Sequence, residues 1–143
     1  METINSKDKA RDFSLVGSVI LYNPDSDVLE HIKSYIEYLD CLFVVNNQNG
    51  EKIIKKLKKE YPNIQVINEP ENMGIAYPLN QVLKLWKDKY DFLMTMDQDS
   101  CYVPGVMEAY VGQIPNFDWH TTLGIGPKKI AYQEECPCGR GTK

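Results

Sequence analysis

The sequence predicts an α/β protein with a mostly parallel sheet and flanking helices. Short runs of β-branched and aromatic residues alternate with stretches in which apolar side chains recur every three or four positions. Residues that favour turns, chiefly Asn, Gly and Pro, separate the two kinds of segment. Strands that alternate with helices form βαβ units with right-handed crossovers, so this order predicts a parallel sheet.

The composition is typical of one globular domain and excludes several classes of protein. The chain has 143 residues, of which 43% are hydrophobic and 25% are charged. The net charge of −4 argues against a protein that binds nucleic acid by neutralising phosphates. Four cysteines are too few for a scaffold built on disulfides, so we expect a reducing compartment. A helix that spans a bilayer needs about 20 apolar residues, and no apolar run in the sequence is nearly this long. We therefore expect a soluble or peripheral protein.

A polar segment, residues 1–12, precedes an apolar run at 13–22 that predicts the first strand. A signal peptide is the alternative, because three basic residues lie before the run. Two aspartates interrupt that basic region, and no small-residue cleavage site follows the run. A buried strand is therefore the favoured interpretation.

The next two elements are a helix and a second strand. Residues 25–40 carry apolar side chains at helical spacing and predict one helix, with caps offered by Asp25 to Asp27. Residues 41–45 are apolar without alternation, as in a strand that is covered on both faces. We expect this strand to end in a polar loop at residues 46–50.

A surface helix is predicted over residues 51–61, with three apolar residues on one face and five lysines elsewhere. The lysines could attract a membrane or an anionic ligand, but flanking glutamates and the negative net charge favour a solvated face. We expect a strand at 64–67, followed by a helix at 75–86 with Pro78 in its first turn. A strand at 91–96, a weaker helix at 104–113 and a fifth strand at 123–126 complete the expected elements.

Asparagine is concentrated in the loops that follow the predicted strands, at 22–24, 46–49 and 68–74. Ligands of open α/β sheets bind beyond the carboxyl ends of the strands, and Asn offers a donor and an acceptor to a base, a ribose or a sugar. A structural role in a turn is the alternative for any single loop. Because no Gly-rich phosphate motif follows the first strand, a phosphate here needs another counter-charge.

Asp97 and Asp99 follow the predicted fourth strand and are one residue apart. Two carboxylates so placed can hold Mg²⁺ or Mn²⁺ beside a diphosphate, and the ion then supplies the counter-charge. An isolated Asp-x-Asp is more often a surface turn, but its position after a buried strand favours the metal site.

Four segments, in order, resemble the inverting nucleotide-sugar glycosyltransferases of family 2 with the GT-A fold, and especially the rhamnosyltransferase-like members. The segments are residues 19–24, 44–49, 71–80 and 90–100. The resemblance covers residues 13–127, which we expect to form a nucleotide-sugar-binding domain, followed by an irregular tail at 128–143.

The resemblance implies a hexosyltransferase that moves a sugar from a UDP or dTDP donor to a hydroxyl of a glycan or lipid-linked acceptor, in bacterial cell-surface polysaccharide synthesis. Asp97 and Asp99 would bind the metal, Mg or Mn. The residues expected to contact the nucleotide sugar are Tyr22, Asn23, Asn46, Asn47, Asn72, Gly74, Asn80 and Asp97. Asn46 departs from the family, which more often has Asp at this position.

Family members continue into an acceptor-binding half that carries the catalytic base, and nothing in this sequence matches it. We therefore expect a truncated, donor-binding half without transfer activity, which self-associates through apolar surface left uncovered near the fourth and fifth strands. No catalytic residue is assigned. A nucleotide-binding or interaction module without transferase activity is the alternative. A phosphoacceptor signalling domain is not favoured, because Asn23 and Pro24 follow the first strand in place of adjacent acids.

Three smaller observations complete the predictions. Cys136 and Cys138 resemble the opening of a small zinc motif, but two further ligands do not follow, so an irregular tail is favoured. His31 and His120 lie far apart in the sequence, and neither is assigned a role. The resemblance places the protein in the cytoplasm, with peripheral contact to the inner face of the membrane as a further expectation.

Overall fold

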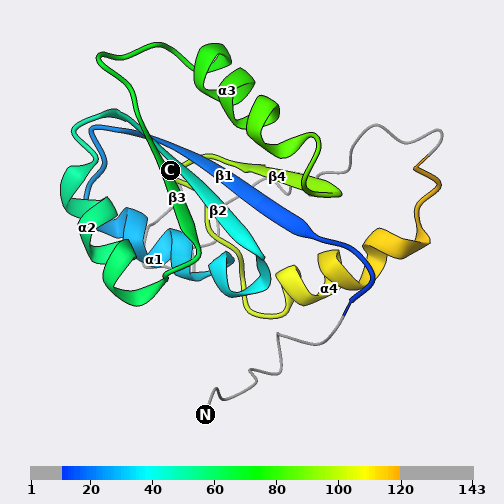
Figure 1. Cartoon of the computed structure of the whole chain (residues 1–143). Helices are drawn as coiled ribbons and strands as arrows, with labels where there is room; N and C mark the ends of the chain where they lie inside the picture. The colour runs from blue at the N-terminus through cyan, green and yellow to red at the C-terminus, as the bar shows by residue number, and fades with distance from the viewer. Residues whose placement is uncertain (1–10, 120–143) are drawn as a thin grey trace.

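The computed structural model describes residues 11–119, which form a parallel sheet with helices on both faces (Figure 1). The strands of this region are β1 (Leu15–Tyr22), β2 (Cys41–Gln48), β3 (Ile64–Asn68) and β4 (Phe92–Met96). They lie in the order β3-β2-β1-β4, and every neighbouring pair is parallel. The predicted α/β class is confirmed.

The helices divide unequally between the two faces of the sheet (Figure 1). One face carries α1 (Asp27–Lys33), α2 (Glu51–Glu60) and α4 (Val106–Gln113), with the 3-10 turns η1 (Ile36–Tyr38) and η2 (Ile114–Asn116). The other face carries α3 (Ala76–Trp86). Successive side chains of a strand point to opposite faces, so each strand contributes to both layers.

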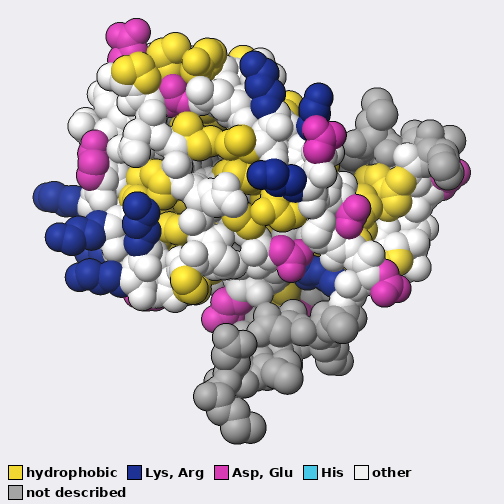
Figure 2. Space-filling model, in the orientation of Figure 1, with side chains coloured by type: hydrophobic (Ala, Val, Ile, Leu, Met, Phe, Trp, Pro, Cys, Tyr) yellow, Lys and Arg dark blue, Asp and Glu magenta, His cyan; other side chains and the backbone are white. Residues whose placement is uncertain are grey.

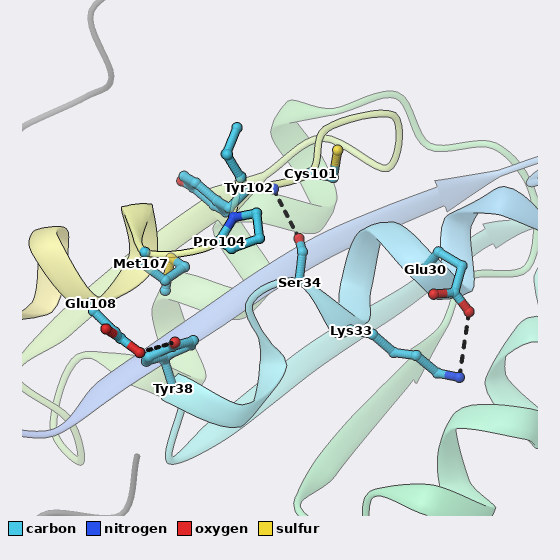
Figure 3. Close-up of a pocket in the computed structure, with 11 residues that line it drawn as sticks. Glu30, Lys33, Ser34, Tyr38, Cys101, Tyr102, Pro104, Met107 and Glu108 are labelled. Carbon is cyan, nitrogen blue, oxygen red and sulfur yellow. Dashed lines mark hydrogen bonds and ion pairs between the residues drawn. The ribbon is translucent and has the colours of Figure 1, made fainter. Parts of the chain in front are cut away.

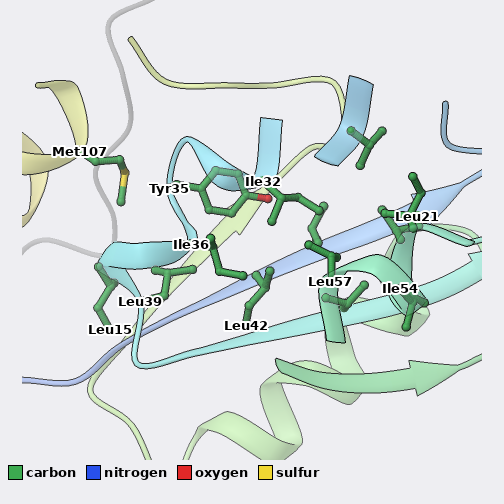
Figure 4. Packing of buried hydrophobic residues seen from close by; sticks show 14 of the residues in the cluster. Leu15, Leu21, Ile32, Tyr35, Ile36, Leu39, Leu42, Ile54, Leu57 and Met107 are labelled. Atoms are coloured by element: carbon green, nitrogen blue, oxygen red, sulfur yellow. The ribbon is translucent and has the colours of Figure 1, made fainter. Parts of the chain in front are cut away.

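The larger apolar core lies between the sheet and the elements α1, η1 and α2 (Figure 4). Tyr35, Ile36 and Leu42 are almost completely buried there. Burial of an Ile or Leu side chain contributes about 1.5 to 3 kcal/mol. The smaller core, under α3, comprises Val16, Cys41, Phe43, Val45 and Val82. Trp86 and Tyr90 pack against its edge.

The single helix expected over residues 25–40 is wrong, because α1 ends at Lys33 and η1 follows. The hydroxyl of Ser34 donates to the carbonyl oxygen of His31 and accepts the backbone N–H of Tyr102 at 2.9 Å. Such a bond to the backbone competes with helix continuation. Tyr35 follows with a φ of −136°, outside the helical range, and its buried ring meets that of Tyr102 edge-on.

The second strand is longer than expected, because β2 continues to Gln48 where we expected a polar loop from residue 46. Asn46 pairs with Leu21 of β1 and with Asn68 of β3, so the ladder holds it on both sides. Asn46 and Asn47 are only 6% and 3% exposed. Polar side chains are tolerated in a buried strand when hydrogen bonds satisfy them, as they do here.

Other expectations agree with the structure within one or two residues. β1 begins at Leu15 and α4 at Val106, each two residues later than expected. Pro78 lies in the first turn of α3, as predicted. The expected fifth strand, at 123–126, and the tail at 128–143 lie outside the described residues. Within residues 11–119, no helix combines the length and the apolar character needed to cross a membrane.

The lysines of α2 are exposed, as predicted for a solvated face. Figure 2 shows basic side chains gathered on the side of the molecule where α2 lies. The three apolar residues of the helix, Ile53, Ile54 and Leu57, are buried against the sheet. The helix is therefore amphipathic, and its position in the fold follows from its apolar face.

Candidate functional site

A cavity of about 610 Å³ lies at the carboxyl ends of β1 and β4, beside the first turns of α3. Residues from the ends of β1, β2 and β4 and from the loop after β3 line it together. Of the residues predicted for the site, those that line this cavity are Tyr22, Asn47, Asn72, Gly74, Asp97 and Asp99. The loops after β3 and β4 thus share one cavity with residues of β1 and β2, whereas the loops after β1 and β2 do not line it.

Asp97 and Asp99 belong to a turn that follows β4 directly. The backbone N–H of Ser100 donates to the carbonyl oxygen of Asp97 at 3.2 Å, which closes the turn. Both aspartates are exposed and both line the cavity. They are the charged residues of its described lining, which includes no Lys, Arg or His. The described lining is therefore acidic and offers no cationic side chain to a phosphate.

Two carboxylates alone do not form a complete metal site. Within residues 11–119, no group of three or more His, Cys, Asp or Glu side chains could hold a metal ion. Mg²⁺ is nevertheless often bound through one or two carboxylates together with substrate phosphates and water. The residues present thus fit an ion that is shared with a bound diphosphate.

Asn47 fixes the loop after β3 to the sheet. Its side-chain Nδ2 donates to Asn72 Oδ1 at 2.9 Å and to the carbonyl oxygen of Gly74 at 3.0 Å, while its Oδ1 accepts the backbone N–H of Met73 at 2.9 Å. Gly74 has a φ of +75°, a conformation that side chains disfavour. Asn47 therefore shapes this wall of the cavity through its neighbours.

Asn46 lies on the opposite face of the sheet and does not line the cavity. Its Oδ1 accepts the backbone N–H of Gly50 at 2.9 Å, and its Nδ2 donates to Glu51 and Asn68, each at 3.2 Å. The carboxylate of Glu51 has a lowered pKa, mainly because it accepts a hydrogen bond from its own backbone N–H and secondly because Asn46 donates to it. A Cβ on Gly50 would lie 2.9 Å from Asn46 Oδ1, so this close approach requires glycine.

Two other predicted residues lie outside the cavity lining. Asn23 follows β1 with a φ of +44°, and its Oδ1 accepts a hydrogen bond from Asn49 Nδ2 at 2.7 Å. Asn80 is exposed on α3. Neither side chain is among those that surround the cavity, so the structure brings together two thirds of the predicted set.

Several residues of the site were missed from the sequence. Ser18 is 1% exposed and lines the cavity, and its hydroxyl has no hydrogen-bond partner among the described residues. A polar residue within an otherwise apolar strand was the signal for it. Gln98 and His31 also contribute, since His31 Nδ1 lies 2.9 Å from the carbonyl oxygen of Gln98. The sequence assigned His31 no role, and no local pattern could reveal this distant partner.

A second cavity, of about 590 Å³, lies between α1, η1 and the loop before α4 (Figure 3). Lys33 lies 3.6 Å from Glu30 at one end, and the hydroxyl of Tyr38 donates to Glu108 at 3.1 Å at the other. The rest of its lining is largely apolar, as Tyr102, Pro104 and Met107 illustrate. None of the residues predicted for the site lines it.

The fold and the first cavity define an α/β protein whose ligand site lies at the carboxyl edge of a parallel sheet, where doubly wound proteins bind nucleotides. The family model described as Glycosyl transferase family 2 matches residues 18–120. The chain belongs to this family of glycosyltransferases, and its sheet with flanking helices is consistent with a GT-A nucleotide-sugar transferase domain. No curated protein gives a significant match to the chain.

Proposed function

We propose that the first cavity binds the nucleoside diphosphate of a sugar donor, of UDP or dTDP type, for transfer of the sugar to an acceptor hydroxyl. The observation that carries this proposal is the convergence of six residues, chosen from separate sequence motifs, on one cavity of a family 2 glycosyltransferase. The cavity volume of about 610 Å³ is in the range of about 300 to 1,000 Å³ that is usual for small-molecule sites.

In this proposal Asp97 and Asp99 bind Mg²⁺ or Mn²⁺ beside the diphosphate. When bound, such an ion neutralises the charge that develops on the departing nucleoside diphosphate. The two carboxylates supply oxygen ligands on a short turn, and the diphosphate supplies others. The described lining has no basic residue, which supports this arrangement. Without a bound cation, the two carboxylates would repel the phosphates.

Other residues of the cavity bind and orient the donor. Tyr22 is 46% exposed and presents an aromatic surface against which a base or a sugar can pack. Asn47 keeps Asn72, Met73 and Gly74 in place through its three hydrogen bonds, so that this loop forms one wall of the nucleotide site. The hydroxyl of Ser18, which has no partner within residues 11–119, offers a buried donor and acceptor to the ligand.

The finer assignments of this proposal rest on the four sequence motifs. They are a rhamnosyltransferase-like specificity, a glycan or lipid-linked acceptor, and a role in bacterial cell-surface polysaccharide synthesis in the cytoplasm, with peripheral contact to the membrane. Self-association is proposed separately, from exposed apolar surface. The affinities for dTDP-rhamnose and UDP-glucose, measured by titration calorimetry with Mn²⁺, test the specificity, and release of dTDP or UDP with and without a glycan acceptor tests the transfer step. Tighter binding of UDP-glucose would contradict the rhamnosyltransferase-like assignment.

Metal dependence gives the sharpest test of the binding site. We expect UDP or dTDP to raise the melting temperature in the presence of Mn²⁺, because a ligand that binds only the native state stabilises it, and to have no effect in the presence of a chelator. The variant Asp99→Asn should lose about 100-fold in metal-dependent affinity by titration calorimetry. Its stability should stay within about 0.5 kcal/mol of the wild type, because the side chain is exposed.

A matched control is Asp88→Asn, which removes the same charge at an exposed position outside the cavity lining. This variant should bind as the wild type does. Equal nucleotide stabilisation with and without chelator, or wild-type affinity in Asp99→Asn, would contradict the proposed metal site.

A further inference from the structure

Gln98, the residue between the two aspartates, ties their turn to the end of β1. Its side-chain Oε1 accepts the backbone N–H of Tyr22 at 3.0 Å, and its Nε2 donates to the carbonyl oxygen of the same residue at 2.9 Å. A single side-chain amide thus satisfies both backbone groups of Tyr22. This geometry is specific, because it requires a donor and an acceptor at the two ends of one planar group.

The two bonds from Gln98 continue the contact between β1 and the β4 region beyond the end of the strand pairing. The pairing of β1 with β4 ends at Val19 and Met96, so beyond these residues the two backbones no longer bond directly. On its other side, Tyr22 lies at an irregularity where β1 shifts its register against β2. The amide of Gln98 therefore joins the turn to the last residue of β1, at a position where the regular pairing of β1 and β4 has ended.

His31 holds the same turn from the opposite side of the sheet. The ring is fully buried on α1, and its Nδ1 lies 2.9 Å from the carbonyl oxygen of Gln98. Because a carbonyl oxygen can only accept, Nδ1 must carry the proton. The other ring nitrogen, Nε2, has no hydrogen-bond partner among the described residues. Within this region, the ring therefore makes its hydrogen bond through Nδ1. An apolar residue at this position would leave the carbonyl oxygen of Gln98 without this donor.

We propose that Gln98 and His31 are positioning residues that hold Asp97 and Asp99 toward the cavity before any ligand arrives. The inference rests on the proposed function, since it concerns how the same carboxylates receive a cation and a diphosphate. A backbone bond of 3.2 Å from Ser100 to Asp97 closes the turn, and the bonds of Gln98 to Tyr22 and His31 join it to β1 and α1. A segment that becomes ordered only when the ligand binds lowers the affinity, because the lost conformational entropy opposes binding. A segment that is already ordered avoids this loss.

The Gln98 anchor is tested with Gln98→Ala and with the matched control Gln113→Ala, which removes an exposed amide at the end of α4. In the protein without ligand, we expect Gln98→Ala to speed the hydrogen exchange of the Tyr22 amide about tenfold or more. Its Mn²⁺-dependent affinity for UDP or dTDP should fall about tenfold by titration calorimetry. Gln113→Ala should change neither quantity.

The His31 anchor is tested with a pair of variants, because a buried substitution also affects folding. His31→Asn keeps an N–H donor close to the place of Nδ1, whereas His31→Leu removes it. We expect His31→Leu to lose about tenfold in metal-dependent nucleotide affinity and His31→Asn to restore it to within about threefold of the wild type. In the wild type, long-range nitrogen–proton NMR spectra should show His31 with its proton on Nδ1.

The outcomes separate this inference from the proposed function. Unchanged nucleotide affinity in Gln98→Ala or in folded His31→Leu would overturn the positioning role, even if the melting temperature fell. A proton on Nε2 of His31, or unchanged Tyr22 exchange in Gln98→Ala, would overturn the contacts themselves. If the wild type bound no nucleotide with Mn²⁺, the proposed function would fail, and the exchange and NMR measurements would still decide whether the anchors exist.

Discussion

The two faces of the sheet differ in how far helices cover them, and the candidate site lies on the less covered face. Elements α1, η1, α2 and α4 cover one face and enclose the larger core (Figure 4). The helix α3 covers the other, and it exposes Tyr77, Leu83 and Leu85, as does Ile75 directly before it. Figure 2 shows hydrophobic side chains on the side of the molecule where α3 lies. The difference shows that one face mainly stabilises the fold, while the other leaves the strand ends open to a ligand.

Asn46 and Asn47 show the same contrast within two adjacent residues. Asn46 turns to the covered face, where it bonds to Gly50, Glu51 and Asn68. Asn47 turns to the α3 face and holds one wall of the cavity. Identical side chains thus have different roles because a strand alternates its faces at every residue.

The largest effect on stability is expected from a matched pair in β2. Val44 and Val45 are both 0% exposed, and they belong to the larger and the smaller core. We expect Val44→Ala to cost about 2 to 3 kcal/mol, from lost burial and from a cavity that cannot collapse. Val45→Ala should cost about 1 kcal/mol less, because a less enclosed core can relax. Urea unfolding measures both, and equal costs would contradict the difference between the two cores.

A second pair, Asn46→Ala and Asn47→Ala, separates the structural role from the binding role. Asn46→Ala should cost about 2 kcal/mol of stability, since it leaves the buried N–H of Gly50 without its acceptor. Its effect on Mn²⁺-dependent nucleotide affinity should be small. Asn47→Ala should cost about 1 kcal/mol, because its loop is partly solvated, and should lower that affinity about tenfold.

Thermal unfolding and titration calorimetry on the same samples test this second comparison. The result that contradicts it is a loss of nucleotide affinity in Asn46→Ala as large as that in Asn47→Ala. Such a result would mean that the two faces of β2 act together on the ligand.

The smallest effect concerns Glu51, on the covered face. Its hydrogen bonds lower its pKa in the folded protein below the usual value of 4.5, so its ionised form stabilises the fold. This contribution is complete above the unfolded pKa and disappears as the pH falls through the folded pKa. We expect Glu51→Gln to lower the melting temperature at pH 7 but to match the wild type once the pH is below the folded pKa.

A control for this pH dependence is Glu71→Gln, a change at an exposed residue of the loop after β3. It should leave the melting temperature close to that of the wild type at both pH values. A difference between wild type and Glu51→Gln that stays constant from pH 7 to a pH below the folded pKa would show that the carboxylate charge does not stabilise α2.

The pattern of the sequence predicted the order of the strands and most of the helices of the described region, and the position of the acidic turn. Apolar runs such as residues 41–45 and the spaced apolar residues of α2 encode local structure, because they depend on nearby residues and on burial. Asp97 and Asp99 could be placed at the site because they follow a buried strand directly, and the carboxyl ends of parallel strands meet at one edge.

Only the tertiary structure decided the roles of individual polar residues. The extent of β2 depends on its pairing with β1 and β3, and this pairing places Asn46 and Asn47 on opposite faces. The bond between His31 and Gln98 joins positions 67 residues apart in the sequence. Local patterns show which residues are buried, but a hydrogen bond between distant residues exists only when the folded chain brings its donor and acceptor within reach.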